Sequence, residues 1–350
     1  MTDGGTGTGG ASGITFVDCE LSPGTAVGAQ PRRREVVVNG RHVKTVDVHA
    51  HCAVPEAQAL MGRRAERPGL LMTQVADRIR AMDEQGIDVE ALSINPYWYE
   101  AERDLAAEVI RVQNAKLAEI CAANPDRFVA FATVALQHPD LAAEQLVEGV
   151  KKYGLRGASV GGSVAGAELA DPRFHPFWAK AEELGVLVFM HPQGTAELER
   201  RLGGQGVLGN TIGNPLETTI ALSHLIFEGT LDRFPGLKLC AAHGGGYLPS
   251  YAARSDAILT TFPERNTRPL AKRPTEYLRQ LYFDALVFTP EALRHLIAET
   301  GASQIMLGTD YPFPWTSTAV EHILATPDLT DAERVAMLGG TAARLLGIEG

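Results

Sequence analysis

The strongest constraint on the fold of this chain is a regular alternation of short apolar segments with longer amphipathic ones. Segments with helical spacing, such as QVADRIRAMDEQG and PFWAKAEELG, separate segments typical of strands. The strand segments begin near Thr45, Val89, Phe128, Leu155, Val186, Leu237, Leu281 and Gln304. Eight strand-helix units predict an α/β fold, a (β/α)8 TIM barrel. The alternative is a doubly wound open sheet, which usually carries a glycine-rich turn after its first strand, where this chain has His-Ala-His.

The N-terminal region differs in composition from the rest. It begins with MTDGGTGTGGASG, which is typical of a flexible tail, and we predict an extension over residues 1–35. The segment EVVVNGRHVKTV predicts a hairpin with Asn39-Gly40 as its turn. Residues 36–350 then form the predicted barrel domain.

Composition excludes several classes of protein. The chain has 350 residues, 45% of them hydrophobic, and a formal charge of −10, so it is not expected to bind nucleic acid or an anionic membrane over a broad surface. It contains no run of about 20 apolar residues and no basic segment followed by an apolar one, so neither a membrane span nor a secretory signal is expected. Its four cysteines form no CxxC pair, which favours a reduced, cytoplasmic setting.

The first predicted barrel strand, TVDVHAHC, ends in two histidines one residue apart. Strict alternation places Asp47, His49 and His51 on one face of this strand. Three ionisable side chains on one face are costly to bury without a partner, and a metal ion is one such partner. Asp47 would then either orient a metal ligand or fill the lower barrel as a paired carboxylate.

Other polar residues also follow predicted strands. His191 follows VLVFM, His243 follows LKLCAA, and Asp310 follows QIMLGT. Catalytic groups of a TIM barrel lie at the C-terminal ends of its strands, so all of these residues are expected at one rim. His49, His51, His191 and Asp310 predict a site for one divalent metal ion, with Zn²⁺ the leading candidate. The alternative is structural: Asp310 caps the following loop, and His191 simply precedes Pro192.

One absence from the predicted rim favours a single metal ion. The fourth predicted strand, LRGASVGGSV, has no Lys or Glu to bridge two ions. His243 is then available as an acid or base. The glycines of HGGGYLP, which no GK[ST] follows, predict a sharp backbone turn beside His243 and no phosphate site.

These motifs resemble the amidohydrolase superfamily: HxH after strand 1, HP after strand 5, HGGG after strand 6 and GTDYPFP after strand 8. The resemblance covers roughly residues 46–346 and is greatest to the decarboxylase branch typified by 2-amino-3-carboxymuconate-6-semialdehyde decarboxylase. It implies a single zinc ion held by the four residues named above, with His243 as acid/base. It also implies two arginines that bind the substrate carboxylate, Arg67 and Arg254, and a homodimer in which Arg254 reaches the neighbouring site. Gln193 stands where that enzyme has tryptophan, so its substrate is not carried over.

The resemblance and the rim residues together predict an enzyme. We expect a metal-dependent, non-oxidative decarboxylase acting on a small unsaturated or aromatic carboxylic acid, with catalytic roles for His243 and Asp310. The alternative is a hydrolase or hydratase of the same superfamily that uses metal-bound hydroxide. A non-catalytic binding protein is disfavoured, because an open metal site does not suit a scaffold.

Overall fold

The computed structural model describes residues 33–64, 68–203 and 206–349. Within them, eight parallel strands begin where the alternation of the sequence predicts, and parallel strands buried on both faces are expected to be rich in apolar residues. The strands are β3 (Val46–His51), β4 (Val89–Ser93), β5 (Phe128–Ala130), β6 (Gly157–Val160), β9 (Leu187–Met190), β10 (Lys238–Ala241), β11 (Tyr282–Asp284) and β12 (Ile305–Met306).

Pairing among these strands closes a barrel. Hydrogen bonds join β3, β4 and β5 in one run, and β6, β9, β10, β11 and β12 in another. A bridge between Ala132 and Ala158 connects the two runs on one side, and a bridge between Ala50 and Tyr311 connects them on the other. The TIM barrel predicted from the sequence is therefore confirmed.

Two short hairpins accompany the barrel. The first pairs β1 (Val37–Val38) with β2 (Arg41–His42). Its turn is Asn39-Gly40, with φ of 49° and 73°, as a two-residue hairpin turn requires. The second, after β6, pairs β7 (Ser163–Val164) with β8 (Ala167–Glu168). The predicted extension over residues 1–35 lies mostly outside the described residues and stays a prediction.

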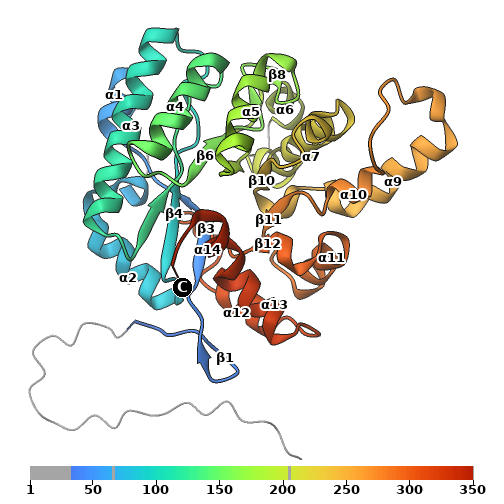
Figure 1. Cartoon of the computed structure of the whole chain (residues 1–350). Helices are drawn as coiled ribbons and strands as arrows, with labels where there is room; N and C mark the ends of the chain where they lie inside the picture. Colours follow the sequence, from blue (N-terminus) through green and yellow to red (C-terminus); the bar gives the residue numbers. More distant parts are fainter. Residues whose placement is uncertain (1–32, 65–67, 204–205, 350) are drawn as a thin grey trace, which may run out of the picture. The chain divides into compact units, whose positions relative to one another are not determined.

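Helices lie around the outside of the strands (Figure 1). No helix among the described residues is both long enough and apolar enough to cross a membrane. Glycines in the left-handed conformation end several of them, such as Gly86 and Gly185. The helices are α1 (Pro55–Leu60), α2 (Val75–Gln85), α3 (Arg103–Ala123), α4 (Pro139–Lys151), α5 (His175–Leu184), α6 (Ala196–Leu202), α7 (Asn214–Phe227), α8 (Thr230–Arg233), α9 (Leu248–Thr261), α10 (Pro274–Tyr277), α11 (Pro290–Thr300), α12 (Ala319–Ala325), α13 (Asp331–Val335) and α14 (Thr341–Leu346).

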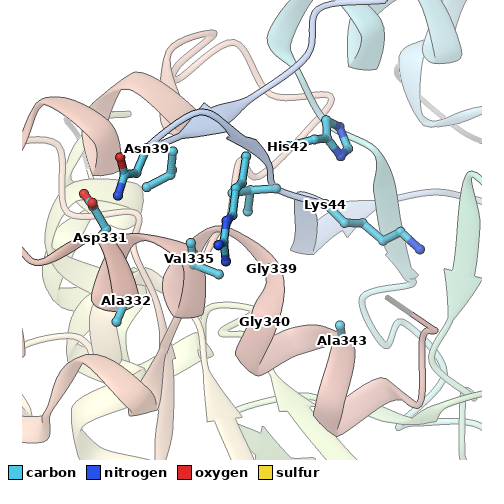
Figure 2. Close-up of a pocket in the computed structure, with 12 residues that line it drawn as sticks. Asn39, His42, Lys44, Asp331, Ala332, Val335, Gly339, Gly340 and Ala343 are labelled. Atoms are coloured by element: carbon cyan, nitrogen blue, oxygen red, sulfur yellow. The ribbon is translucent and has the colours of Figure 1, made fainter.

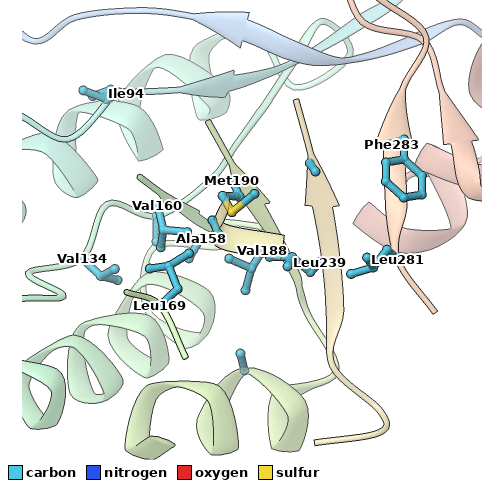
Figure 3. Close-up of a cluster of buried hydrophobic side chains, with 14 of the residues drawn as sticks. Ile94, Val134, Ala158, Val160, Leu169, Val188, Met190, Leu239, Leu281 and Phe283 are labelled. Atoms are coloured by element: carbon cyan, nitrogen blue, oxygen red, sulfur yellow. The ribbon is translucent and has the colours of Figure 1, made fainter. Parts of the chain in front are cut away.

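The apolar core has two layers. Alternate strand residues face the helices, and Figure 3 shows part of this outer layer, with Ala158, Val160, Val188, Met190 and Leu239. The other set fills the barrel interior and includes Val46, Val48, Phe189 and Met306. These residues cluster with Phe131 and with three residues of α14, namely Ala342, Leu345 and Leu346. Because these residues occupy the lower barrel, the polar site lies at the C-terminal ends of the strands.

A wide helical turn, η8 (Ala336–Gly340), packs against the start of β3. A Cβ atom added to Gly339 would lie 1.9 Å from the carbonyl oxygen of Lys44, whereas one added to Gly340 would meet its nearest atom, the carbonyl oxygen of Val335, at 3.3 Å. We therefore expect Gly339→Ala to destabilise the protein by about 3 kcal/mol, because backbone cannot easily move aside.

Gly340→Ala is the matched control, and it should change stability by less than about 1 kcal/mol, because improved helix propensity offsets slight crowding. Apparent melting temperatures of the two variants check this. Equal melting temperatures would show that η8 does not pack tightly on β3.

Candidate metal centre

Four buried side chains converge at the C-terminal ends of three strands. His49 and His51 come from β3, His191 follows β9, and Asp310 follows β12, so the structure brings together the four residues predicted from the sequence. The Nε2 atoms of His49 and His51 are 3.0 Å apart. Asp310 Oδ1 lies 2.8 Å from His51 Nε2 and 3.1 Å from His49 Nε2. One ligand atom from each of the four residues falls within 4.8 Å of the others.

The donors of this cluster suit a divalent ion. Ligand atoms of a metal bound at about 2.0–2.1 Å lie roughly 3 Å from one another, as the nitrogens of His49 and His51 do. Both ring nitrogens of His191 are buried and have no hydrogen-bond partner among the described residues. Buried polar atoms are rarely left without a partner, so a cation at this position would explain the arrangement.

The electrostatics of the cluster favour positive charge between the carboxylates. Burial lowers the pKa of His49, but the carboxylates of Asp310 and Asp284 outweigh burial and raise the pKa to about 10. Burial lowers the pKa of His51 to about 4 and that of His191 well below its usual value. Two neutral imidazoles beside carboxylates that attract a cation are the state that metal binding requires.

Hydrogen bonds fix which ring nitrogen of each β3 histidine faces the cluster. His49 Nδ1 donates to Asp284 Oδ2 at 2.7 Å. The hydroxyl of Ser93 donates to the carbonyl of Ala50 at 3.2 Å and accepts from His51 Nδ1 at 3.1 Å. Both histidines therefore direct Nε2 into the cluster, the nitrogen that a metal ion would bind once its proton is released, as ligands held by a second layer of polar groups do.

Asp284 was not predicted from the sequence. It is the last residue of β11, in YFDAL, and its side chain is fully buried. The rule that identified His191 and Asp310, a polar residue at the end of an apolar strand, applies equally to this aspartate. Its carboxylate also accepts from the backbone N–H groups of His243 and Gly244, both at 2.9 Å.

The predicted orientation of Asp47 is wrong. Strand β3 pairs with β4 through Asp47–Glu90 and His51–Ser93, and the register shifts between Asp47 and Ala50. Paired residues of neighbouring strands point to the same side, and Glu90 and Ser93 lie on opposite faces of β4. The bulge in β3 therefore turns Asp47 to the face opposite His51.

Asp47 connects strands outside the metal cluster. Its carboxylate accepts from the backbone N–H groups of His49 at 2.9 Å and Thr309 at 3.1 Å, and from the hydroxyl of Thr309. Burial and the neighbouring Glu90 raise the pKa of Asp47 to about 7. Since Thr309 directly precedes Asp310, Asp47 holds together the two segments that carry His49 and Asp310.

His243 lies beside the cluster on the turn that follows β10. Its Nε2 is 3.8 Å from Asp310 Oδ2, and its side chain is 17% exposed, so it can reach both the cluster and solvent. Its backbone has a φ of 55°, and Gly244, Gly245 and Gly246 also have positive φ. A Cβ atom on Gly246 would lie 2.1 Å from the carbonyl oxygen of Pro215, so the predicted sharp turn is confirmed.

A pocket of about 260 Å³ leads to the cluster. Its lining includes Asn214, His243, Leu286, Phe288, Asp310 and Trp315. A larger cavity of about 900 Å³ lies elsewhere, between the hairpin β1–β2 and the C-terminal helices (Figure 2). Its lining includes Lys44, which precedes β3, so it is at the opposite end of the barrel from the metal centre.

Of the two predicted arginines, the structure describes Arg254. Arg254 lies on α9 and its side chain is exposed. It does not line the 260 Å³ pocket of its own chain. Arg67 lies outside the described residues.

Comparisons with known proteins agree with this geometry. The family model described as Amidohydrolase matches residues 46–348. The 2-amino-3-carboxymuconate-6-semialdehyde decarboxylase of Dictyostelium discoideum is 30% identical, over 78% of this chain and 76% of its own length. The gamma-resorcylate decarboxylase of Rhodococcus jostii is 32% identical, over 78% of this chain and 87% of its own length.

A solved structure adds a metal and an inhibitor to this comparison. The dihydroxybenzoic acid decarboxylase of Polaromonas sp. JS666, determined with bound manganese and 2-nitroresorcinol, superposes with a TM-score of 0.79 at 29% identity. The match covers 87% of this chain and 97% of that one. This relative therefore binds a divalent metal and an aromatic compound.

We expect Asp284→Asn to lower the affinity for a divalent metal about 10- to 100-fold. The amide removes the negative charge that fixes the His49 ring, and its NH2 group cannot accept the donated hydrogen bonds. Competition against a chelator measures the affinity, and circular dichroism checks the fold.

Asp328→Asn is the control, since Asp328 is an exposed partner of Arg294 and such pairs contribute little. A folded Asp284→Asn protein with wild-type affinity would contradict the role given to Asp284.

Proposed function

Because the chain belongs to the amidohydrolase family, we propose that it is a metal-dependent, non-oxidative decarboxylase of a small aromatic carboxylic acid. The observation that carries this proposal is the position of the four-ligand cluster and His243 beside a pocket that reaches Asp310. The two relatives named above are both decarboxylases.

The metal ligands in this proposal are His49, His51, His191 and Asp310. A bound divalent ion would withdraw electron density from a substrate oxygen as negative charge develops. One ion per chain is supported by β6, where Gly157–Val160 offers no ionisable side chain for a second. Zinc is the proposed metal, since three imidazoles and one carboxylate suit it; manganese, bound by the Polaromonas relative, is the competing ion.

The chain's acid in this reaction is His243. Decarboxylation breaks the bond between the ring carbon and the carboxyl carbon, CO₂ leaves, and the electron pair stays on the ring carbon. A proton must then be added to that carbon, and His243 Nε2 is the donor at the pocket wall. Its partial exposure allows solvent to restore the proton.

Asp310 is proposed to act in two ways. Its Oδ1 faces the two histidines of β3, and its Oδ2 faces His243 Nε2 at 3.8 Å. A carboxylate in this position orients the His243 ring at the edge of the pocket. Asp310 would thus be both a metal ligand and a positioning group for His243.

We further propose a homodimer as the active unit. The C-terminal part of α9 projects from the barrel (Figure 1), and its residues from Ala253 to Thr261 are exposed or only partly buried. It carries the exposed Arg254, and Tyr251 on the same helix is 68% exposed. A helix that projects with an exposed aromatic and an arginine suits a subunit contact. Arg254 would reach the partner's site and pair with a carboxylate of its substrate.

Two further parts of the proposal concern binding and cell compartment. Arg67 would be a second arginine that binds the substrate carboxylate. A cytoplasmic setting is supported by three cysteines that are unpaired in the structure, Cys52, Cys121 and Cys240.

A panel of aromatic and muconate-like acids, with separate detection of CO₂ and of the organic product, tests the reaction class. The proposal expects equal amounts of CO₂ and decarboxylated product from at least one acid. Turnover of esters, lactones or amides without CO₂ release would instead identify a hydrolase.

We expect His243→Asn to retain the metal content of the wild type, one ion per chain, and to lose about 10²- to 10⁴-fold in kcat. The reason is that four other residues supply the metal ligands, while His243 supplies the proton. Elemental analysis and kcat on the same sample separate the two roles.

Loss of metal in His243→Asn would make His243 a ligand, and wild-type kcat would exclude its catalytic role. A wild-type protein with two ions per chain would contradict the mononuclear site.

Mixing two inactive variants tests the shared site. Arg254→Ala and His243→Ala homodimers should each be weakly active, because each lacks one group in both sites. Mixed dimers should regain activity at one of their two sites, up to about half of the wild-type rate per dimer. Activity that stays at the level of the parents at every mixing ratio, with subunit exchange verified, would rule out a contribution of Arg254 across the interface.

A further inference from the structure

We infer that the substrate is a single-ring aromatic acid whose ring packs against Phe288 and Trp315 and whose other ring substituents are neutral and polar. This inference rests on the decarboxylase function proposed above. It concerns the pocket of about 260 Å³ beside the metal centre. Pockets for drug-sized ligands are commonly about 300–1,000 Å³, so this volume suits one substituted ring.

Phe288 has two energetically unfavourable features, an exposed side chain and a left-handed backbone, that packing does not explain. Its side chain is 60% exposed, although phenylalanine is normally buried. Its backbone has a φ of 65°, in the left-handed region that bulky residues rarely adopt. Strained residues of this kind concentrate at functional sites. A role in holding a ligand would explain both costs.

Trp315 is the second exposed aromatic of the same pocket. Its side chain is 46% exposed, whereas Trp98 and Trp178 are fully buried. Leu286, which is almost fully buried, completes the apolar wall. Offset or edge-to-face packing of aromatic rings is favourable, so an aromatic substrate would cover the surfaces that Phe288 and Trp315 expose.

The charge of the pocket argues for a neutral substituent. No lysine or arginine is found among the described residues that line it, and its charged or titratable groups are His243 and Asp310, at the metal centre. The two arginines proposed above, Arg67 and Arg254, are assigned to the carboxylate that leaves as CO₂. A second carboxylate on the ring would therefore lose its hydration against the described wall of the pocket without gaining a cation of its own. A hydroxyl or similar group would not have this cost.

Asn214 is positioned to bind that substituent. It lies at the start of α7, is partly exposed, and lines the pocket. Its side-chain amide has no hydrogen-bond partner among the residues of the structure that are described, while the nearby Thr211 already donates its hydroxyl to the carbonyl of Val207 at 2.9 Å. An amide can both donate and accept, so Asn214 suits a ring hydroxyl.

The two relatives are named for acids that differ in the number of carboxyl groups. One is named for an acid that carries two carboxyl groups, 2-amino-3-carboxymuconate-6-semialdehyde, and the other for gamma-resorcylate, a dihydroxylated benzoic acid. The two are similarly identical to this chain, so identity does not choose between them. The pocket favours the second kind of substrate.

Phe288 and Trp315 together are called the aromatic clamp below. Binding of 2-nitroresorcinol to metal-loaded protein, measured by tryptophan fluorescence, tests this clamp without turnover. Trp315 is the exposed tryptophan, so the compound should quench its emission, and Trp315→Phe should lose most of the quenching while still binding. We expect Phe288→Ala to weaken binding roughly 3- to 10-fold. Tyr153→Ala, two residues after the end of α4 and absent from the lining of the pocket, is the aromatic control and should bind as the wild type does. Equal affinity of Phe288→Ala and wild type would overturn the clamp.

Turnover of 2-hydroxybenzoate and 2-hydroxyisophthalate, which differ by one carboxylate, tests the charge of the substituent. We expect a higher kcat/KM for the monocarboxylate. The variant Asn214→Leu tests the hydrogen bond to a ring hydroxyl: it should lower kcat/KM for gamma-resorcylate about 10-fold, while kcat/KM for benzoate, which has no hydroxyl, changes little. Faster turnover of the dicarboxylate would overturn the inference and leave the decarboxylase function intact. Absence of CO₂ from every acid would refute the proposed function, and the binding measurements would still decide whether the clamp exists.

Discussion

The buried carboxylate of Asp284 is the group on which the geometry of the site depends. It accepts hydrogen bonds from the His49 ring and from the backbone N–H groups of His243, Gly244 and Leu286. Burial opposes its ionisation, but the hydrogen bond and charge of His49 and the N–H of Gly244, with the other contacts that favour the charged form, together outweigh burial and lower the pKa of Asp284 below its usual value. Hydrogen bonds to a charged group contribute about 1.5–3 kcal/mol each. One carboxylate thus fixes both a metal ligand and the turn that carries the proposed acid.

The sequence predicted the barrel and the metal residues because both follow from local rules. Apolar strands and amphipathic helices differ in period, so the eight units could be recognised without knowing their contacts. The C-terminal ends of barrel strands meet at one rim, so His49, His191 and Asp310 could be brought together although up to 261 positions separate them in the sequence. The relatives and the solved structure agree with the family that these motifs resemble.

The features that the sequence did not predict depend on contacts between distant segments. The bulge in β3 reverses Asp47, whose partner Thr309 follows β12, and no period in TVDVHAHC reveals it. Asp284 could have been noticed as a polar residue at a strand end, but its bond to His49 required the fold. The exposure of Phe288 and Trp315 is likewise a property of the assembled pocket and not of their own segments.

In the function proposed for this chain, one divalent ion at the four-ligand cluster enables the release of CO₂ from an aromatic acid. The most direct test strips the protein with a chelator, adds metal back in known amounts, and follows CO₂ release from gamma-resorcylate or another accepted acid. Activity should fall to background on stripping and return in proportion to added metal, with a plateau at one equivalent per chain. Full activity in the metal-free protein, or a plateau at two equivalents, would contradict this proposal.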